Sequence, residues 1–219
     1  MEFREFLAKQ EEVYNRFRDT SKIKSLGTQP NIPESQSGYL MVFRHPLEMA
    51  LEIEKFSRRI ATHVPLMVYD SITIHTTISD YGIVSGSFAP DKTILEKLSK
   101  VAQKISKTPP TISYTEWLYN QNTLFVAGNS NELFLQIAEQ AKAKAEREGI
   151  QLRLPWGAHI TAARFKESKT PKDLEEFFKL MQEAPLIGNS KSKFLDVGYF
   201  DFSPRGFNIT IHDRFNLQT

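Results

Sequence analysis

The sequence predicts an α+β protein in which two antiparallel sheets form a central cleft and helices lie outside. Segments typical of strands and helices alternate along the 219 residues, and the order strand, helix, strand, helix, strand occurs twice. The middle strand of each half alternates apolar and polar side chains, which favours open-faced antiparallel sheets over a covered parallel sheet. The composition, 40% hydrophobic and 25% charged, is that of a globular protein with a real core.

Residues 1–37 are expected to form an N-terminal helix and a polar linker. Apolar side chains recur at helical spacing from Phe3 to Phe17, which predicts an amphipathic helix. The stretch 19–38 is longer than the usual connection of about 4–6 residues, so it is a linker, a lid or a surface wrap. We expect the wrap. Residues 38–219 would then form a bilobal domain, with lobes at roughly 38–121 and 122–219.

The first lobe is expected to start with a buried strand at 39–44 and a helix at 46–61 that Pro46 opens. The next strand is "SITIHTTISDY", residues 71–81. Its two faces differ. One face is mainly apolar and consists of Ile72, Ile74, Thr76 and Ile78. The other face is polar and consists of Ser71, Thr73, His75, Thr77 and Ser79. A helix at 91–106, with Asp91 as its N-cap, and a strand at 109–121 complete this lobe.

The second lobe repeats the order. Strands are expected at 123–129 and 155–165, and helices at 131–149 and 170–184. Gly149 can terminate the first of these helices. The chain is expected to end in strands at 193–203 and 207–215, joined as a hairpin through "PRG".

The overall composition excludes several classes of function. A net charge of +2 is too small for a protein that coats long nucleic acid by charge alone. The chain has no cysteine, which excludes disulfides and thiolate metal sites and favours a reducing compartment. The N-terminus does not resemble a secretory signal, and no stretch approaches the ~18 apolar residues of a membrane span. We expect a cytoplasmic monomer without a membrane partner.

Each middle strand carries the motif histidine, any residue, threonine. His75 and Thr77 lie in "IHTTI", and His159 and Thr161 lie in "AHITA". Residues i and i+2 of a strand point to the same face, so each motif presents an imidazole beside a hydroxyl. A single such motif is more often a hydrogen-bonded structural pair than a catalyst. Two motifs at equivalent places in a repeated layout favour catalysis in one shared cleft.

This set of side chains suits phosphodiester chemistry. One neutral imidazole can take a proton from an attacking water, and the other, protonated, can donate to the leaving oxygen. The threonine hydroxyls can donate to the non-bridging oxygens, where charge concentrates in the transition state. Two histidines without carboxylates or thiolates make a poor zinc site, so we expect neither a metal nor a cofactor.

The paired motifs resemble those of the two-histidine (2H) phosphoesterases, a superfamily that includes the RNA 2′,3′-cyclic phosphodiesterases once called 2′-5′ RNA ligases. The resemblance covers the chain from about Tyr39 to its end. "HITA" fits the family pattern of histidine and threonine interleaved with apolar residues, whereas "HTTI" has Thr76 at an apolar position. The resemblance implies a pseudo-symmetric bilobal fold with His75, Thr77, His159 and Thr161 as its catalytic residues.

Other side chains are candidates for binding substrate or serve as comparisons. Tyr199 and Trp156 offer rings on which a base could stack, and Arg205 is a candidate for the rim of the cleft, as is Arg44. Arg164 has the wrong strand parity to share a face with His159. The remaining histidines, His45, His63 and His212, lack the threonine and are expected at the surface or as caps, although His212 could line the cleft.

We therefore expect metal-independent hydrolysis of a 2′,3′-cyclic phosphate or a 2′-5′ linkage in a small nucleotide or oligonucleotide, including RNA ends. Two alternatives use the same cleft. One is a hydrolase of cyclic oligonucleotide second messengers with the same four residues. The other is a non-catalytic module that binds RNA ends or nucleotides.

Overall fold

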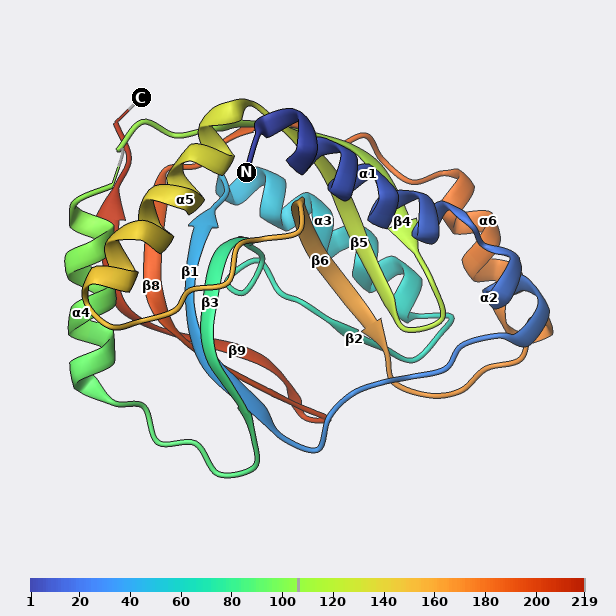
Figure 1. Ribbon diagram of the computed structural model, residues 1–219. Coiled ribbons are helices and arrows are strands. Elements are labelled where there is room, and N and C mark those ends of the chain that lie inside the picture. Colours follow the sequence, from blue (N-terminus) through green and yellow to red (C-terminus); the bar gives the residue numbers. More distant parts are fainter. Residues whose placement is uncertain (106, 219) are drawn as a thin grey trace.

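Two antiparallel sheets confirm the predicted fold class in the computed structural model, which describes residues 1–105 and 107–218 (Figure 1). The first sheet has the strand order β3-β1-β8-β9 and consists of β1 (Gln36–Arg44), β3 (Thr76–Ser85), β8 (Phe194–Ser203) and β9 (Gly206–Asn216). The second sheet has the order β2-β6-β5-β4-β7 and consists of β2 (Leu66–Val68), β4 (Thr111–Tyr119), β5 (Thr123–Ser130), β6 (Ala158–Phe165) and β7 (Gly188–Lys191).

Helices cover the outer faces of the sheets. They are α1 (Phe3–Arg18), α2 (Ser21–Leu26), α3 (Leu47–Ala61), α4 (Lys92–Gln103), α5 (Glu132–Arg147), the 3-10 turn η1 (Lys172–Leu174) and α6 (Glu175–Gln182). In Figure 1, α4 and α5 flank the first sheet, and α1 runs across the second. As expected, Asp91 caps α4 by accepting a hydrogen bond from the Thr93 N–H. Gly149 follows α5 with a φ of 78°, a left-handed conformation that suits glycine.

The two sheets do not follow the two halves of the sequence. The first sheet takes β1 and β3 from residues 38–121 and β8 and β9 from residues 122–219. The second sheet also takes strands from both ranges. Each expected lobe of consecutive residues is therefore spread over both sheets.

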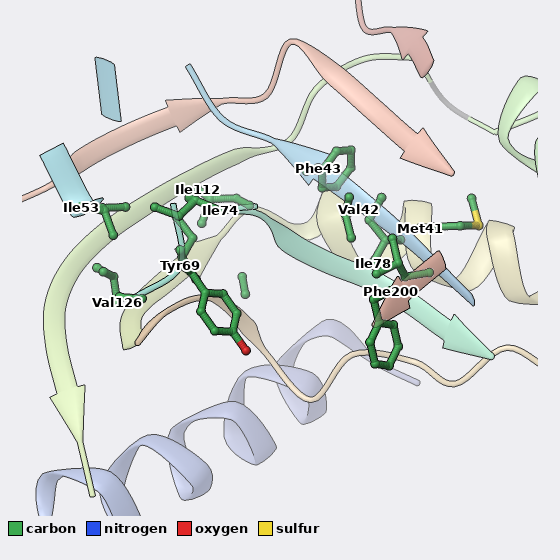
Figure 2. Packing of buried hydrophobic residues seen from close by; sticks show 14 of the residues in the cluster. Met41, Val42, Phe43, Ile53, Tyr69, Ile74, Ile78, Ile112, Val126 and Phe200 are labelled. Carbon is green, nitrogen blue, oxygen red and sulfur yellow. The ribbon is translucent and has the colours of Figure 1, made fainter. Parts of the chain in front are cut away.

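The core is centred on β1, which lies between β3 and β8. Its last eight residues are all buried, because helices cover one face of the first sheet and the second sheet lies near the other. Figure 2 shows Val42 of β1, Ile78 of β3 and Phe200 of β8 among the buried side chains of this core. This packing holds the backbone of β3 firmly, and β3 is the strand that carries the first motif.

The N-terminal segment belongs to the same folded unit. The Tyr14 hydroxyl of α1 donates to the main-chain oxygen of Ala158, 3.0 Å away, and accepts from the Gly128 N–H at 3.1 Å. The Gln10 side-chain oxygen accepts from the Ala158 N–H at 2.9 Å. Ala158 is the residue before His159, so α1 supports the second motif directly. The linker after α1 is a surface wrap, held where the Thr28 hydroxyl donates to the Glu167 carbonyl.

The strand of the first motif begins later than expected, so that His75 lies just before it. Residues 71–73 form a turn, β3 starts at Thr76, and Ile72 is 75% exposed rather than buried. The turn forms because the Asp70 carboxylate accepts a hydrogen bond from the Thr73 N–H, which competes with strand pairing. The alternation from Ile74 to Ile78 is as predicted.

Other differences are smaller. The short strands β2 and β7 were not predicted, because three or four residues give too few alternations to recognise. The helix expected at 91–106 ends at Gln103. Residue 106 of this helix and residue 219, the end of the expected domain, lie outside the described residues. Among the described residues, no helix has the length and apolar character needed to cross a membrane.

Candidate active site

A cavity of about 230 Å³ lies where the two sheets meet, and all four motif side chains line it. Thr77 lies at the start of β3 and His75 directly precedes this strand, whereas His159 and Thr161 lie in β6. The cavity is also lined by Tyr69, Asp80, Trp156, Arg164, Phe200, Phe202 and Phe207. The two motifs therefore meet in one place, although they belong to different sheets.

The two imidazoles are held in the same way. The Nδ1 atom of His75 lies 2.6 Å from the main-chain oxygen of Thr73, two residues earlier. The Nδ1 atom of His159 lies 3.3 Å from the main-chain oxygen of Gly157, again two residues earlier. A carbonyl can only accept, so each Nδ1 carries the proton and each Nε2 can accept one. This shared arrangement prepares both rings for proton transfer.

Burial lowers the pKa of both motif histidines. The pKa of His75 falls to about 3, chiefly through burial; Arg44 and His159 act in the same direction, and the hydrogen bond to the Thr73 carbonyl opposes them. The pKa of His159 falls to about 4, again chiefly through burial, with Arg164 contributing in the same direction. Both rings are therefore neutral at pH 7 in the free protein. An anion bound between them would favour protonation of one.

An aromatic ring covers each imidazole. Trp156 stacks on His159 with ring centres 4.0 Å apart and an interplanar angle of 20°. Phe207 stacks on His75 at 5.7 Å and 15°, and Tyr69 stacks on Phe207 at 4.7 Å and 4°. These rings restrict water around the histidines. Trp156 remains 39% exposed, so part of its surface is open to solvent.

Arg164 lines the cavity, contrary to its expected parity. Pairing between β5 and β6 runs from Phe125–Thr161 to Leu124–Ala163, so Ala162 is an extra residue in β6. This β-bulge reverses the alternation and turns Arg164 to the same side as Thr161. Its guanidinium lies 4.9 Å above the Phe202 ring. No carboxylate among the described residues forms an ion pair with it, so it offers an uncompensated positive charge to the cavity.

A buried polar network joins the two sheets beneath the motifs. Thr76, which is 0% exposed, contacts the hydroxyl of Tyr114 in β4, the Nε2 atom of His45 at 3.1 Å and the main-chain oxygen of His159 at 3.1 Å. The Nδ1 atom of His45 lies 2.8 Å from the Ser190 hydroxyl of β7. His45 is thus buried, and its expected place at the surface is wrong. Burial lowers its pKa to about 3.

The direction of each hydrogen bond in this network follows from counting protons. The His159 carbonyl can only accept, so the single hydroxyl proton of Thr76 points to it. The Tyr114 hydroxyl and the His45 Nε2–H then donate to the Thr76 oxygen, and the Ser190 hydroxyl donates to His45 Nδ1. Every member is satisfied, which is the condition under which a buried polar network stabilises one arrangement.

Arg44 is a buried structural residue rather than the expected rim residue. Its Nε donates to the carboxylate of Asp196, 2.8 Å away, and Asp196 is itself 0% exposed and also bound by Arg214. The Nη1 atom of Arg44 donates to the main-chain oxygens of Ile72 and Ile74. The ion pair therefore fixes the segment that leads into the first motif.

The remaining candidates lie outside this cavity. Tyr199 is on the opposite face of β8 from Phe200 and Phe202 and packs against Phe88, which corrects its expected place in the cleft. Arg205 lies at the β8–β9 turn and lines a neighbouring cavity. His63 is exposed, as expected. The Nε2 atom of His212 lies 3.8 Å from the carboxylate of Asp213, and His212 does not line the cavity. Among the described residues, no cluster of three or more His, Asp or Glu side chains is arranged to hold a metal ion.

Comparison with known proteins supports the fold. No protein-family model and no curated protein matches the sequence. Among solved structures, one titled phosphoesterase has 18% identity and a TM-score of 0.58 over 84% of this chain and 99% of the other. TT0787 of Thermus thermophilus has 16% identity and a TM-score of 0.59 over 82% and 97%. E. coli LigT complexed with 3′-AMP has 16% identity and a TM-score of 0.56 over 84% and 99%. The fold expected from the paired motifs is thus confirmed.

Proposed function

We propose that the chain is a metal-independent phosphodiesterase that acts on 2′,3′-cyclic phosphate or 2′-5′-linked nucleotides and oligonucleotides. One observation carries the proposal: His75 and His159 line one cavity, each with Nδ1 bound to the carbonyl two residues earlier and each accompanied by a threonine. This arrangement gives one cavity two equivalent proton-transfer groups, as acid–base cleavage of a phosphodiester requires.

In the proposed reaction one imidazole acts as base and the other as acid. The neutral ring takes a proton from water at Nε2 while the water oxygen bonds to phosphorus. The ester oxygen leaves and receives the proton that the second ring carries, so one P–O bond forms as another breaks. Because burial lowers both pKa values, the acid acquires its proton when the phosphodiester anion binds.

Three further groups stabilise the charge that develops on phosphorus. The hydroxyls of Thr77 and Thr161 donate to the non-bridging oxygens, and the Arg164 guanidinium, which forms no ion pair with a carboxylate among the described residues, lines the same cavity. In a cavity walled by aromatic rings such interactions are stronger than in solvent. E. coli LigT, which shares the fold, has been crystallised with 3′-AMP, ATP and NADP+, and this supports a nucleotide as the ligand.

The test is turnover of defined substrates in the presence of EDTA. The panel should hold 2′,3′-cyclic mononucleotides, 2′-5′ oligoadenylates, RNA ends with a cyclic phosphate, and cyclic di- and trinucleotides, with products identified by mass spectrometry. We expect hydrolysis of the first three classes and a ~10²–10⁴-fold loss in His75→Ala and in His159→Ala. His63→Ala, which alters an exposed histidine, is the matched control and should retain full activity.

Other outcomes assign the cavity differently. Turnover of cyclic di- and trinucleotides alone would identify a second-messenger hydrolase. A requirement for added zinc or magnesium would contradict the mechanism. If no substrate is turned over and nucleotides still bind to the His75→Ala, His159→Ala double variant, the chain is a binding module.

A further inference from the structure

A second cavity, of about 300 Å³, lies beside the first and shares Phe207 with it. One wall is the strand β2, and another is the turn between β8 and β9, residues 204–206. Strand β2 is the outermost strand of its sheet, so the side of it away from β6 has no neighbouring strand. Main-chain groups on such an edge can bond to a ligand.

The charges around this cavity favour an anion. Lys166 and Arg205 line it, both are exposed, and neither forms an ion pair with any residue in the described part of the chain. The carboxylate of Asp70 is also present, but its Oδ1 accepts hydrogen bonds from the N–H and the hydroxyl of Thr73, both at 2.8 Å. Two cations therefore face one carboxylate that is already engaged within its own turn.

The cations continue from one cavity to the next. Arg164 lines the first cavity and Lys166, two residues later, lines the second. Alternate residues of an extended chain lie about 6.5 Å apart on the same side, which suits successive charges along a single-stranded nucleic acid. Phe207 stands between the two cavities, with one face against Tyr69, and separates the site of reaction from the second site.

We propose that the second cavity binds the phosphate next to the one that reacts, so that the preferred substrate is an oligonucleotide end with at least two phosphates. This proposal rests on the proposed function of the first cavity. It gives Arg205, a candidate from the sequence, a place outside the reacting site. Mononucleotides would occupy the first cavity alone and gain nothing from Lys166 and Arg205.

The experiment compares substrates that differ only in one charge. A dinucleotide that ends in a 2′,3′-cyclic phosphate is used with either a normal internal phosphodiester or a neutral methylphosphonate at the same position. A cyclic mononucleotide is the third substrate. KM and kcat are measured for each, and equilibrium binding of both dinucleotides is followed separately by tryptophan fluorescence, to which Trp156 at the first cavity contributes, so the result does not depend on turnover.

The variant is Lys166→Ala, Arg205→Ala, and the control is Lys22→Ala, Lys24→Ala, which removes the same charge from exposed positions on α2. For the charged dinucleotide we expect KM and the dissociation constant to rise roughly 3- to 30-fold in the first variant. The slope of log affinity against log salt should also fall by about 0.7 for each lost phosphate contact. The methylphosphonate and the mononucleotide should be unaffected.

Each outcome separates the two proposals. The second site is supported if affinity for the charged dinucleotide falls in the Lys166→Ala, Arg205→Ala variant and not in the control variant. This holds even if binding is observed without turnover. Equal behaviour of the charged and neutral dinucleotides in the parent protein would overturn it. So would an equal loss in the control variant. If none of the three substrates is hydrolysed, the proposed function is wrong. The equilibrium binding of the charged and neutral dinucleotides still tests the second site in that case.

Discussion

The hydroxyl of Thr76 lies 3.1 Å from the main-chain oxygen of His159. Thr76 directly follows His75, so a side chain in one motif holds the backbone of the other. The bond crosses from the first sheet to the second, because Thr76 belongs to β3 and His159 to β6. This contact, and the network behind it, sets the relative position of the two imidazoles.

Replacing Thr76 with valine should reduce turnover more than it reduces substrate binding. Valine keeps the shape of threonine but leaves the His159 carbonyl, the Tyr114 hydroxyl and His45 without their shared partner. We expect unfolding to become easier by about 1–3 kcal/mol and kcat to fall on the order of 10²-fold, with KM nearly unchanged. Steady-state kinetics and urea unfolding provide both values.

Thr76→Ser is the matched control, since serine retains the hydroxyl. It should recover most of the lost kcat. A merely structural role would lower stability in Thr76→Val while kcat of the folded fraction stays the same, and that result would contradict the positioning role.

His45 should make the protein sensitive to acid. Its pKa in the folded protein is about 3, lowered by burial, then by the neighbouring charges of His75 and Arg44. In the unfolded chain it is near 6.5, so between these values only the unfolded state takes up the proton. Stability therefore falls as pH drops from about 6.5, by up to ~1.4 kcal/mol for each pH unit from this residue.

His45→Gln should remove that dependence. The slope of the unfolding free energy against pH, measured between pH 6.5 and 4.5, gives the number of protons taken up on unfolding. This number should be smaller by about one in the variant than in the parent protein. His75 and His159, whose pKa values are lowered to about 3 and 4, are present in both proteins, so the comparison isolates the proton of His45. Identical slopes would show that His45 already ionises in the folded state.

Asp196 should be essential for stability. It is fully buried between Arg44 and Arg214, and Arg44 is itself buried. Asp196→Asn would leave the Arg44 charge without a counter-ion, and we expect a loss of roughly 3–5 kcal/mol. Asp201→Asn, the same change at an exposed position on β8, should have little effect. Thermal unfolding followed by circular dichroism distinguishes them, and similar losses would argue against the buried ion pair.

Sequence reasoning found the motifs but not the elements that support them. The period-two pattern placed His75 with Thr77 and His159 with Thr161, because alternation is a local property of a strand. Arg164 was not predicted to line the cavity, because no residue type near Ala162 indicates the β-bulge there. The exchange of strands between sheets was missed for a related reason: pairing depends on contacts between distant segments.

His45 and Thr76 show the same limit for single residues. A histidine before a proline suggests a surface junction, and a threonine at an apolar position suggests a departure from a pattern. Each is explained only by the other, since their side chains meet in the buried network. Nothing local to either residue indicates a partner from another strand.

Arg164 should contribute to turnover as the cation of the first cavity. Arg164→Met keeps the apolar stem that packs near Phe202 and removes the charge beside the motifs. We expect kcat/KM to fall on the order of 10²-fold. Arg58→Met is the control, because Arg58 is exposed on α3, is already paired with Glu54 and does not line the cavity, so this change should alter activity only slightly. Equal effects of the two changes would mean that overall charge, rather than position, matters.

The dependence of activity on pH should differ between the free and the substrate-bound protein. In the free protein the pKa values of His75 and His159 are about 3 and 4, both lowered chiefly by burial. The active form needs one proton shared between the two rings, so its fraction in the free protein decreases as pH rises above about 4. A bound phosphodiester raises the pKa of the acid, which extends the active range upward.

The profile of kcat/KM should therefore be bell-shaped with an acidic maximum, and kcat should stay high to a more basic pH than kcat/KM. Binding of 3′-AMP should take up a proton, which calorimetry in two buffers of different ionisation enthalpy measures directly. His159→Asn keeps a polar side chain that cannot carry the proton, and it should abolish most of this uptake if His159 is the acid. His75→Asn tests the other assignment in the same way. If neither variant changes the uptake, the proton resides elsewhere and the two-histidine mechanism does not hold.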